Sequence, residues 1–118
     1  MSQEIEFVVE WTVKPGKLEE FKKLAKIETS AVRAKEPKAR RYQWYINGEK
    51  NRFLLTECYV DSDAMLAHLK NLSPLLPELE KTADVTRFEI LGNLTDEAEE
   101  AARLIHAKRY VYWVGVNR

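Results

Sequence analysis

The sequence has very little cysteine and no net charge, and both facts limit what the protein can be. Cys58 is the single cysteine, which excludes an internal disulfide framework and a Cys-rich metal site. A lone cysteine also suits a reducing cytoplasm. The 19 Lys and Arg residues balance 19 Asp and Glu residues, so no net field favours nucleic acid or an acidic membrane as a partner.

Motifs for cofactors and membrane segments are missing as well. No ligand-spaced cluster of His, Asp or Glu suggests a metal, and no Gly-rich loop suggests a nucleotide or flavin, so we expect no cofactor. No apolar run approaches the roughly 20 residues of a membrane helix. The acidic start, MSQEIEFVVEW, has no basic signal-peptide region. We therefore expect a cytoplasmic protein.

What is present is a globular balance, with 45% hydrophobic and 32% charged residues in a chain of 118. Alternating hydrophobicity predicts strands, and a helical period predicts helices, the second of which is capped by Asp61 or Ser62 and interrupted by Pro74 and Pro77. The strands are expected at residues 4–13, 39–46, 52–60 and 84–92, the first helix at 17–35, and the second after its cap at residue 61 or 62. This order, β-α-β-β-α-β, predicts a ferredoxin-like α+β domain over residues 1–94, with an antiparallel sheet and both helices on one face.

We expect residues 95–118 to be a helix-strand extension of the same domain. The stretch TDEAEEAARLIHAKR is acidic at its start and basic at its end, which predicts a helix aligned with its dipole and places His106 near its C-terminal end. The following YVYWVGV predicts a strand. This extension either lengthens the sheet or covers a neighbouring subunit, and its role cannot be read from the sequence.

The face of the predicted sheet that no helix covers mixes both charge signs with a few apolar groups. Two interpretations remain open for it, a solvated face or a self-complementary two-fold interface. Its expected residues are Glu6, Val8, Glu10, Arg41, Gln43, Tyr45, Arg87 and Glu89.

Three stretches together resemble the antibiotic-biosynthesis monooxygenase (ABM) superfamily over roughly residues 5–92. They are WTVKPGKLEEFKKL, EPKARRYQWY and FLLTECYVDSDAMLAHLKN. The last contains the pattern Glu-x-Tyr-x-Asp-x-x-Ala-x-x-x-His, here Glu57, Tyr59, Asp61, Ala64 and His68. Each piece is weak alone, but their order and spacing make the resemblance specific for a fold family.

The resemblance implies a dimeric α+β barrel, a homodimer in which two sheets meet by their bare faces, with a cleft in each subunit between sheet and helices. Some members oxygenate polycyclic phenols or quinols with molecular oxygen and use neither flavin nor metal. Others degrade haem. That branch fits less well, because Glu78 and Val9 stand where those relatives place an axial histidine and an asparagine, and a carboxylate is an unusual haem ligand.

Two ionisable residues are the candidates for catalysis. His68 lies on the apolar face of its helix, where it is either a base for a phenolic proton or a core histidine satisfied by hydrogen bonds. Glu28 lies on the apolar stripe of the first helix. Either it borders the cleft, as a hydrogen-bonded pair with His68, or it is rotated to the edge of the stripe and solvated.

The aromatic residues Trp11, Trp44, Tyr42 and Tyr59 are candidates for the walls of a binding pocket, or else belong to the core. The motif residues Glu57 and Asp61 are expected to have structural roles. For Glu57 a catalytic role is an equally good interpretation.

Whether the protein is an enzyme stays open in the sequence. The leading hypothesis is a cofactor-independent monooxygenase for phenols or quinols, and the alternatives are a non-enzymatic dimeric protein that binds a small aromatic molecule and a cleft that side chains have filled. An open cleft in which His68 and a second polar group converge would favour the enzyme. The substrate and pathway are not determined.

Overall fold

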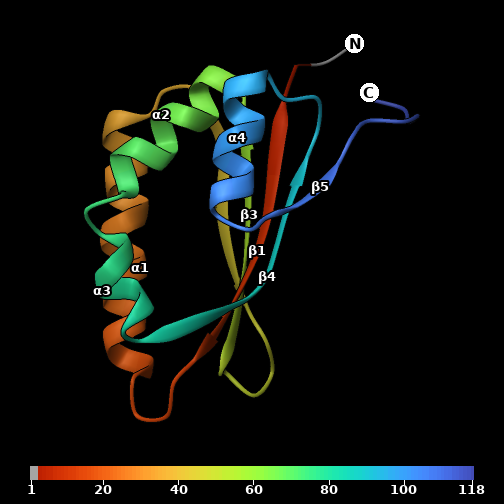
Figure 1. The fold of residues 1–118 in the computed structure, drawn as a ribbon. Coiled ribbons are helices and arrows are strands. Elements are labelled where there is room, and N and C mark those ends of the chain that lie inside the picture. The colour runs from red at the N-terminus through yellow and green to blue at the C-terminus, as the bar shows by residue number, and fades with distance from the viewer. Residues whose placement is uncertain (1–2) are drawn as a thin grey trace.

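The computed structural model describes residues 3–118, which form five strands and four helices (Figure 1). In chain order they are β1 (Ile5–Val13), α1 (Leu18–Lys35), β2 (Ala39–Ile46), β3 (Arg52–Tyr59), α2 (Ser62–Leu72), α3 (Leu76–Glu80), β4 (Ala83–Leu91), α4 (Asp96–Leu104) and β5 (Lys108–Tyr110). The predicted β-α-β-β-α-β order is confirmed.

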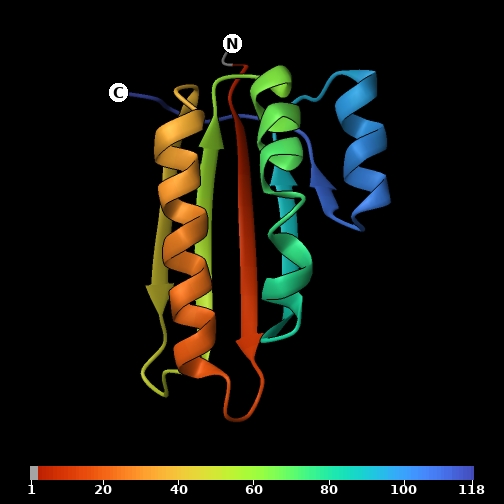
Figure 2. The same ribbon diagram turned by 90° about the vertical axis from the view of Figure 1, so that its left-hand side faces the viewer.

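One sheet has the strand order β2-β3-β1-β4-β5. The four long strands pair in antiparallel fashion, as predicted, and β5 pairs in parallel with β4, so the extension makes the sheet mixed. The helices cover one face of the sheet (Figure 1). Seen from that side, α1 lies over β2 and β3, while α2 and α3 lie over β1 and β4 (Figure 2).

The strand β1 is central and supplies much of the core. Ile5, Phe7, Val9 and Trp11 point toward the helices and are buried, which confirms the predicted alternation. They pack on residues that the helical period places on the inner stripe, among them Phe21 of α1.

The second helical region divides as the prolines predicted. Asp61 is the N-cap of α2, and its carboxylate accepts a hydrogen bond from the Ala64 amide at 2.9 Å. The helix ends at Leu72, before Pro74, and α3 begins again with Pro77 in its first turn, where a proline needs no amide partner.

The prediction for the end of the chain is wrong in two places. The last helix ends at Leu104, so His106 lies beyond it, with a positive φ of 59°. The strand predicted at residues 110–116 is limited to Lys108–Tyr110, and residues 111–118 have no regular structure. The strand is short because its neighbour β4 ends at Leu91. The last hydrogen bond between the two segments is donated by the Gly92 amide to the Tyr110 carbonyl, at 2.9 Å.

The face of the sheet without helices carries ion pairs within the chain. Arg41 pairs with Glu6 at 3.1 Å, and Arg87 pairs with Glu89 at 2.8 Å. On this same side the C-terminal residues stand away from the sheet (Figure 1), and Trp113 among them is 89% exposed. Within residues 3–118, no helix is both long and apolar enough to cross a membrane.

Candidate functional site

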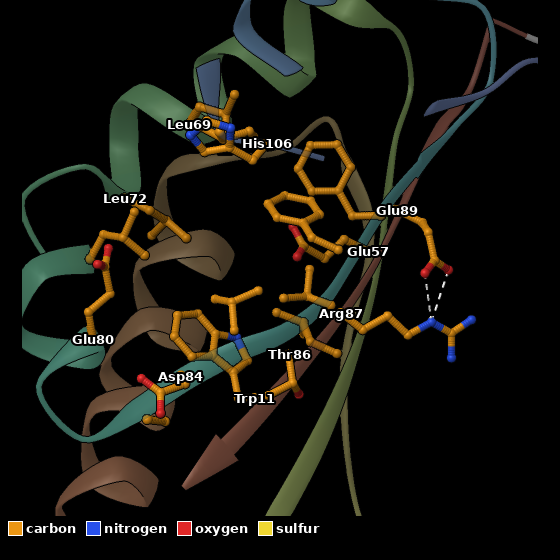
Figure 3. Close-up of a pocket in the computed structure, with 18 of the residues that line it drawn as sticks. Trp11, Glu57, Leu69, Leu72, Glu80, Asp84, Thr86, Arg87, Glu89 and His106 are labelled. Atoms are coloured by element: carbon orange, nitrogen blue, oxygen red, sulfur yellow. Dashed lines mark hydrogen bonds and ion pairs between the residues drawn. The ribbon is translucent and has the colours of Figure 1, made fainter. Parts of the chain in front are cut away.

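A cleft of about 890 Å³ lies between α2 and α3 on one side and β1 and β4 on the other. Figure 3 shows Leu69 and Leu72 on the helix side, with Trp11 and Glu57 reaching in from the sheet. Most of the inner lining is apolar, from Phe7, Val9, Trp11, Leu55, Leu69, Leu72, Leu76 and Phe88. The turn between α4 and β5 adds Ile105, His106 and Lys108. The cleft is therefore open rather than filled by side chains.

His68 lies in this cleft between two carboxylates. Its Nδ1 is 2.9 Å from Oε1 of Glu36, and its Nε2 is 3.1 Å from Oε1 of Glu57. Three elements meet here, because Glu36 is the C-cap of α1, Glu57 lies on β3 and His68 lies on α2. Asn71, one helical turn after His68, also donates to Glu36, at 2.6 Å. The contacts leave neither ring nitrogen free.

These two carboxylates determine the charge of the ring. Burial lowers the pKa of His68, which is 4% exposed, but the hydrogen bonds with Glu36 and Glu57 outweigh it and raise that pKa to about 9. Near neutral pH the ring is an imidazolium that donates from both nitrogens. The ring of Tyr59 lies 4.8 Å away, between centroids, a distance at which an aromatic ring stabilises a cation.

A protonated ring with both nitrogens occupied is poorly suited to the role of base that the sequence suggested for His68. A base must present an unprotonated atom to the proton it removes. The geometry instead fits a ring that holds the carboxyl groups of Glu36 and Glu57 in place at one end of the cleft.

Glu28 is buried, at 5% exposure, and it lines the cleft. The interpretation of a solvated residue at the edge of the stripe is therefore wrong. The expected bond to His68 is also wrong, because the hydroxyl of Tyr42 donates to Oε1 of Glu28 instead. Burial raises the pKa of Glu28 to about 7, against the lowering effect of the Tyr42 hydrogen bond. Near neutrality this carboxyl group can therefore take up or release a proton.

Glu57 is the second carboxyl group in the cleft lining. Its Oε1 accepts from the hydroxyl of Tyr59 as well as facing His68. Burial, followed by the charge of Glu57, raises the pKa values of Tyr42 and Tyr59 far above the usual range. Both phenols therefore stay protonated and act as donors that orient the two carboxyl groups.

Of the four aromatic residues predicted to form pocket walls, Trp11 lines the cleft. Tyr42 and Tyr59 stand behind it and touch it through Glu28 and Glu57. Trp44 lies outside the lining, and its indole N–H donates to Oγ1 of Thr29 at 2.9 Å. The sequence could not separate these positions, because residues of neighbouring strands share one face whether they reach the cleft or only the core.

Sequence reasoning missed Glu36, which holds His68 from 32 positions away. Its one signal was its place in EPKARRYQWY, since no periodicity relates the end of one helix to the middle of another. It also missed His106 and Lys108 as lining residues, because their position depends on where α4 ends. No group of three or more His, Cys, Asp or Glu within residues 3–118 is arranged to hold a metal ion.

The model of one protein family, antibiotic biosynthesis monooxygenase, matches residues 5–82. The chain belongs to this family. As an ABM protein it has a fold shared with solved structures, whereas no curated protein matches its sequence.

MupZ from Pseudomonas fluorescens is 20% identical, with a TM-score of 0.85 over 100% of this chain and 91% of that chain. SnoaB, a cofactor-independent oxygenase from Streptomyces nogalater, is 20% identical, with a TM-score of 0.66 over 75% of this chain and 91% of that chain. A conserved protein from Methanosarcina mazei Go1 is 25% identical, with a TM-score of 0.64 over 75% and 88%. The match to MupZ covers the whole chain and therefore includes the C-terminal extension.

Proposed function

We propose that this ABM protein is a cofactor-independent monooxygenase that activates a phenol- or quinol-type aromatic molecule for reaction with molecular oxygen. The observation that carries the proposal is the convergence of Glu28, Glu57 and the His68 imidazolium in one apolar, open cleft. The family match and the likeness to SnoaB, a cofactor-independent oxygenase, support the reaction class.

Glu28 is the proposed base. A base works best when its pKa lies near the operating pH, and that of Glu28 is about 7. The donor Tyr42 holds one of its oxygens. His68 is the proposed positioning residue: its ring is held between Glu36 and Glu57, and it keeps the carboxyl group of Glu57 in place in the cleft lining.

The proposed reaction converts a phenol that has a free ring C–H, plus dioxygen, into a quinone and water. Glu28 takes the hydroxyl proton, and the phenolate then gives one electron to dioxygen. The two radicals combine in a C–O bond, and the O–O bond breaks as the ring C–H proton leaves. One oxygen atom stays as the new carbonyl, the other leaves as water with the two protons, and dioxygen accepts four electrons in all. Apolar walls limit the water that could quench the intermediates.

A binding protein of the same fold is the second candidate, and the buried charges argue against it. Burying ionised groups is unfavourable, and an apolar ligand needs only apolar walls. A pocket meant for binding alone has no use for a carboxyl group that titrates near neutrality.

We also propose a homodimer through the bare face of the sheet. The pairs Arg41–Glu6 and Arg87–Glu89 place both charge signs on this face, an arrangement that a two-fold axis can make self-complementary. The exposed tail adds apolar surface on the same side, and isolated soluble chains rarely leave such surface uncovered. Analytical ultracentrifugation should give twice the chain mass, and a monomer at all concentrations would contradict the dimer.

The experiment for the activity follows oxygen uptake by the purified protein with a panel of polycyclic phenols and quinols, with no cofactor added. Glu28→Gln keeps the shape and the acceptor for Tyr42 but cannot take a proton, and Glu19→Gln on the exposed side of α1 is the matched control. We expect the wild type and Glu19→Gln to take up oxygen at similar rates. The rate should be at least about a hundredfold lower in Glu28→Gln. Equal oxygen uptake by all three proteins would contradict the role of Glu28 as the base. No oxygen uptake by the wild type with any compound of the panel would contradict the proposed oxygenase activity.

A further inference from the structure

The indole nitrogen of Trp11 has no hydrogen-bond partner. Within residues 3–118 it is the one buried side-chain nitrogen or oxygen in that condition. Trp11 is 4% exposed and lines the cleft. Buried donors almost always have a partner, so an orphaned one in the wall of a cavity indicates an acceptor that binds there. Trp44 shows the contrast, because its N–H is satisfied by Thr29.

The strand register fixes where this donor lies relative to the carboxyl groups. On β3 and β1, Glu57 pairs with Phe7, Leu55 with Val9, and Phe53 with Trp11. Phe7 and Trp11 are four residues apart, which corresponds to about 13 Å along a strand. The backbone positions that carry Glu57 and Trp11 are therefore separated by a stretch that is longer than a single ring, with the apolar residues Val9 and Leu55 between them.

The strand β4 is deformed opposite Trp11. Its pairing with β1 shifts between Glu10 and Trp11: Glu10 faces Arg87 and Trp11 faces Val85, which leaves Thr86 as the extra residue of a bulge. Bulges bend a strand and re-aim its side chains. In Figure 1, β4 runs from α3 across to the sheet, and its residues Ala83, Val85 and Phe88 are part of the cleft lining. The bulge thus brings Val85, and not Thr86, opposite Trp11.

We infer that Trp11 is a specificity-determining residue whose N–H binds an acceptor oxygen at the end of the substrate opposite its acidic hydroxyl. The inference rests on the proposed function for the position of that hydroxyl at Glu28 and Glu57. The ligand class is then an elongated, mainly apolar molecule with a proton donor at one end and a carbonyl-type acceptor at the other. A molecule with the hydroxyl alone leaves the indole N–H unsatisfied and binds more weakly.

The test uses two naphthol probes without oxygen, so that neither is consumed. One is an acetylnaphthol with hydroxyl and acetyl groups at opposite ends of the two rings, and the other is the ethylnaphthol that lacks only the carbonyl oxygen. Calorimetry gives each dissociation constant, and absorbance reports the fraction bound as naphtholate. The proteins are the wild type, Trp11→Phe, which keeps a flat ring without the N–H, and Trp44→Phe as control.

The wild type and Trp44→Phe should bind the acetylnaphthol about tenfold more tightly than the ethylnaphthol, as one hydrogen bond predicts. Trp11→Phe should bind both equally. Should Trp11→Phe not fold, the comparison of the two probes on the wild type still tests the acceptor. No preference in the wild type, a preference kept in Trp11→Phe, or no binding of either probe overturns the inference. Binding with the expected preference but without naphtholate would leave it standing and count against the proposed function instead.

Discussion

The state of Glu28 can be tested through stability, without knowing the substrate. Its pKa is 4.5 in an ordinary environment and about 7 in the folded chain. The folded chain therefore holds a proton that the unfolded chain releases, so the free energy of unfolding falls as the pH rises from about 4.5 through about 7. The full difference corresponds to about 3 kcal/mol, and about 2.5 kcal/mol of it is lost between pH 5 and pH 8.

The groups around Glu28 also change stability in this pH range, and their contribution must be distinguished from that of Glu28. Tyr42 donates to it, and Glu57, His68 and Glu36 act on it through their charges. Because the folded pKa of His68 is raised from 6.5 to about 9, its contribution is complete below about 6.5 and is lost as the pH rises through about 9. The titration of His68 lowers the free energy of unfolding by a further amount of about 2 kcal/mol between pH 5 and pH 8.

The variant Glu28→Gln isolates the part of the pH dependence of stability that is due to Glu28. The amide resembles the protonated acid in shape and still accepts from Tyr42, so stability near pH 5 should change little. Between pH 5 and pH 8 this variant should lose only the part due to His68, about 2.5 kcal/mol less than the wild type loses. Urea denaturation followed by circular dichroism at several pH values measures this difference.

The control for this series is Glu19→Gln, which removes an exposed carboxylate from the same helix and should follow the wild-type curve. Parallel curves for the wild type and Glu28→Gln would refute the reasoning, because Glu28 would then be ionised in the folded chain and unsuited to take a proton near neutrality.

Three other variants test the structure around the cleft. His68→Ala leaves Glu36 and Glu57 buried without their cation, so it should lose about 3–5 kcal/mol near pH 6, and this loss should shrink as the pH rises past about 9. Asp61→Ala removes the cap of α2 and should cost about 1 kcal/mol by urea denaturation, whereas an unchanged midpoint would contradict the cap. Gly92→Ala places a methyl group 2.8 Å from the Glu4 carbonyl at a φ of 124°, and should cost about 1–3 kcal/mol. Gly48→Ala, with open space around it, is its control and should have little effect on the melting temperature.

The fold was largely predictable because local patterns and global packing agree. The alternation of Phe7, Val9 and Trp11, the cap at Asp61 and the break at Pro74 each have a local cause, and the structure keeps all of them. The prediction of the last strand was wrong for a non-local reason. YVYWVGV has the composition of a strand, but a strand forms only where a neighbour offers its backbone, and β4 ends too early.

The site was predictable in its residues more than in their roles. The helical period put Glu28 and His68 on inward faces, and both line the cleft. Their protonation follows from partners on other elements, Tyr42 for Glu28 and Glu36 for His68, which no spacing in the sequence reveals. Assigning the base to the histidine followed from its ordinary pKa, and the two carboxylates reverse that assignment.

Labelled dioxygen tests the central claim most directly. The purified protein is incubated, without added cofactor, with isotopically labelled dioxygen and the phenol of the panel that gives the fastest uptake, and the product is analysed by mass spectrometry. We predict a quinone with one labelled oxygen atom, formed by the wild type and Glu19→Gln and strongly reduced in Glu28→Gln. A product with no label, or one formed equally well with Glu28→Gln, would contradict a monooxygenase that begins with proton transfer to Glu28.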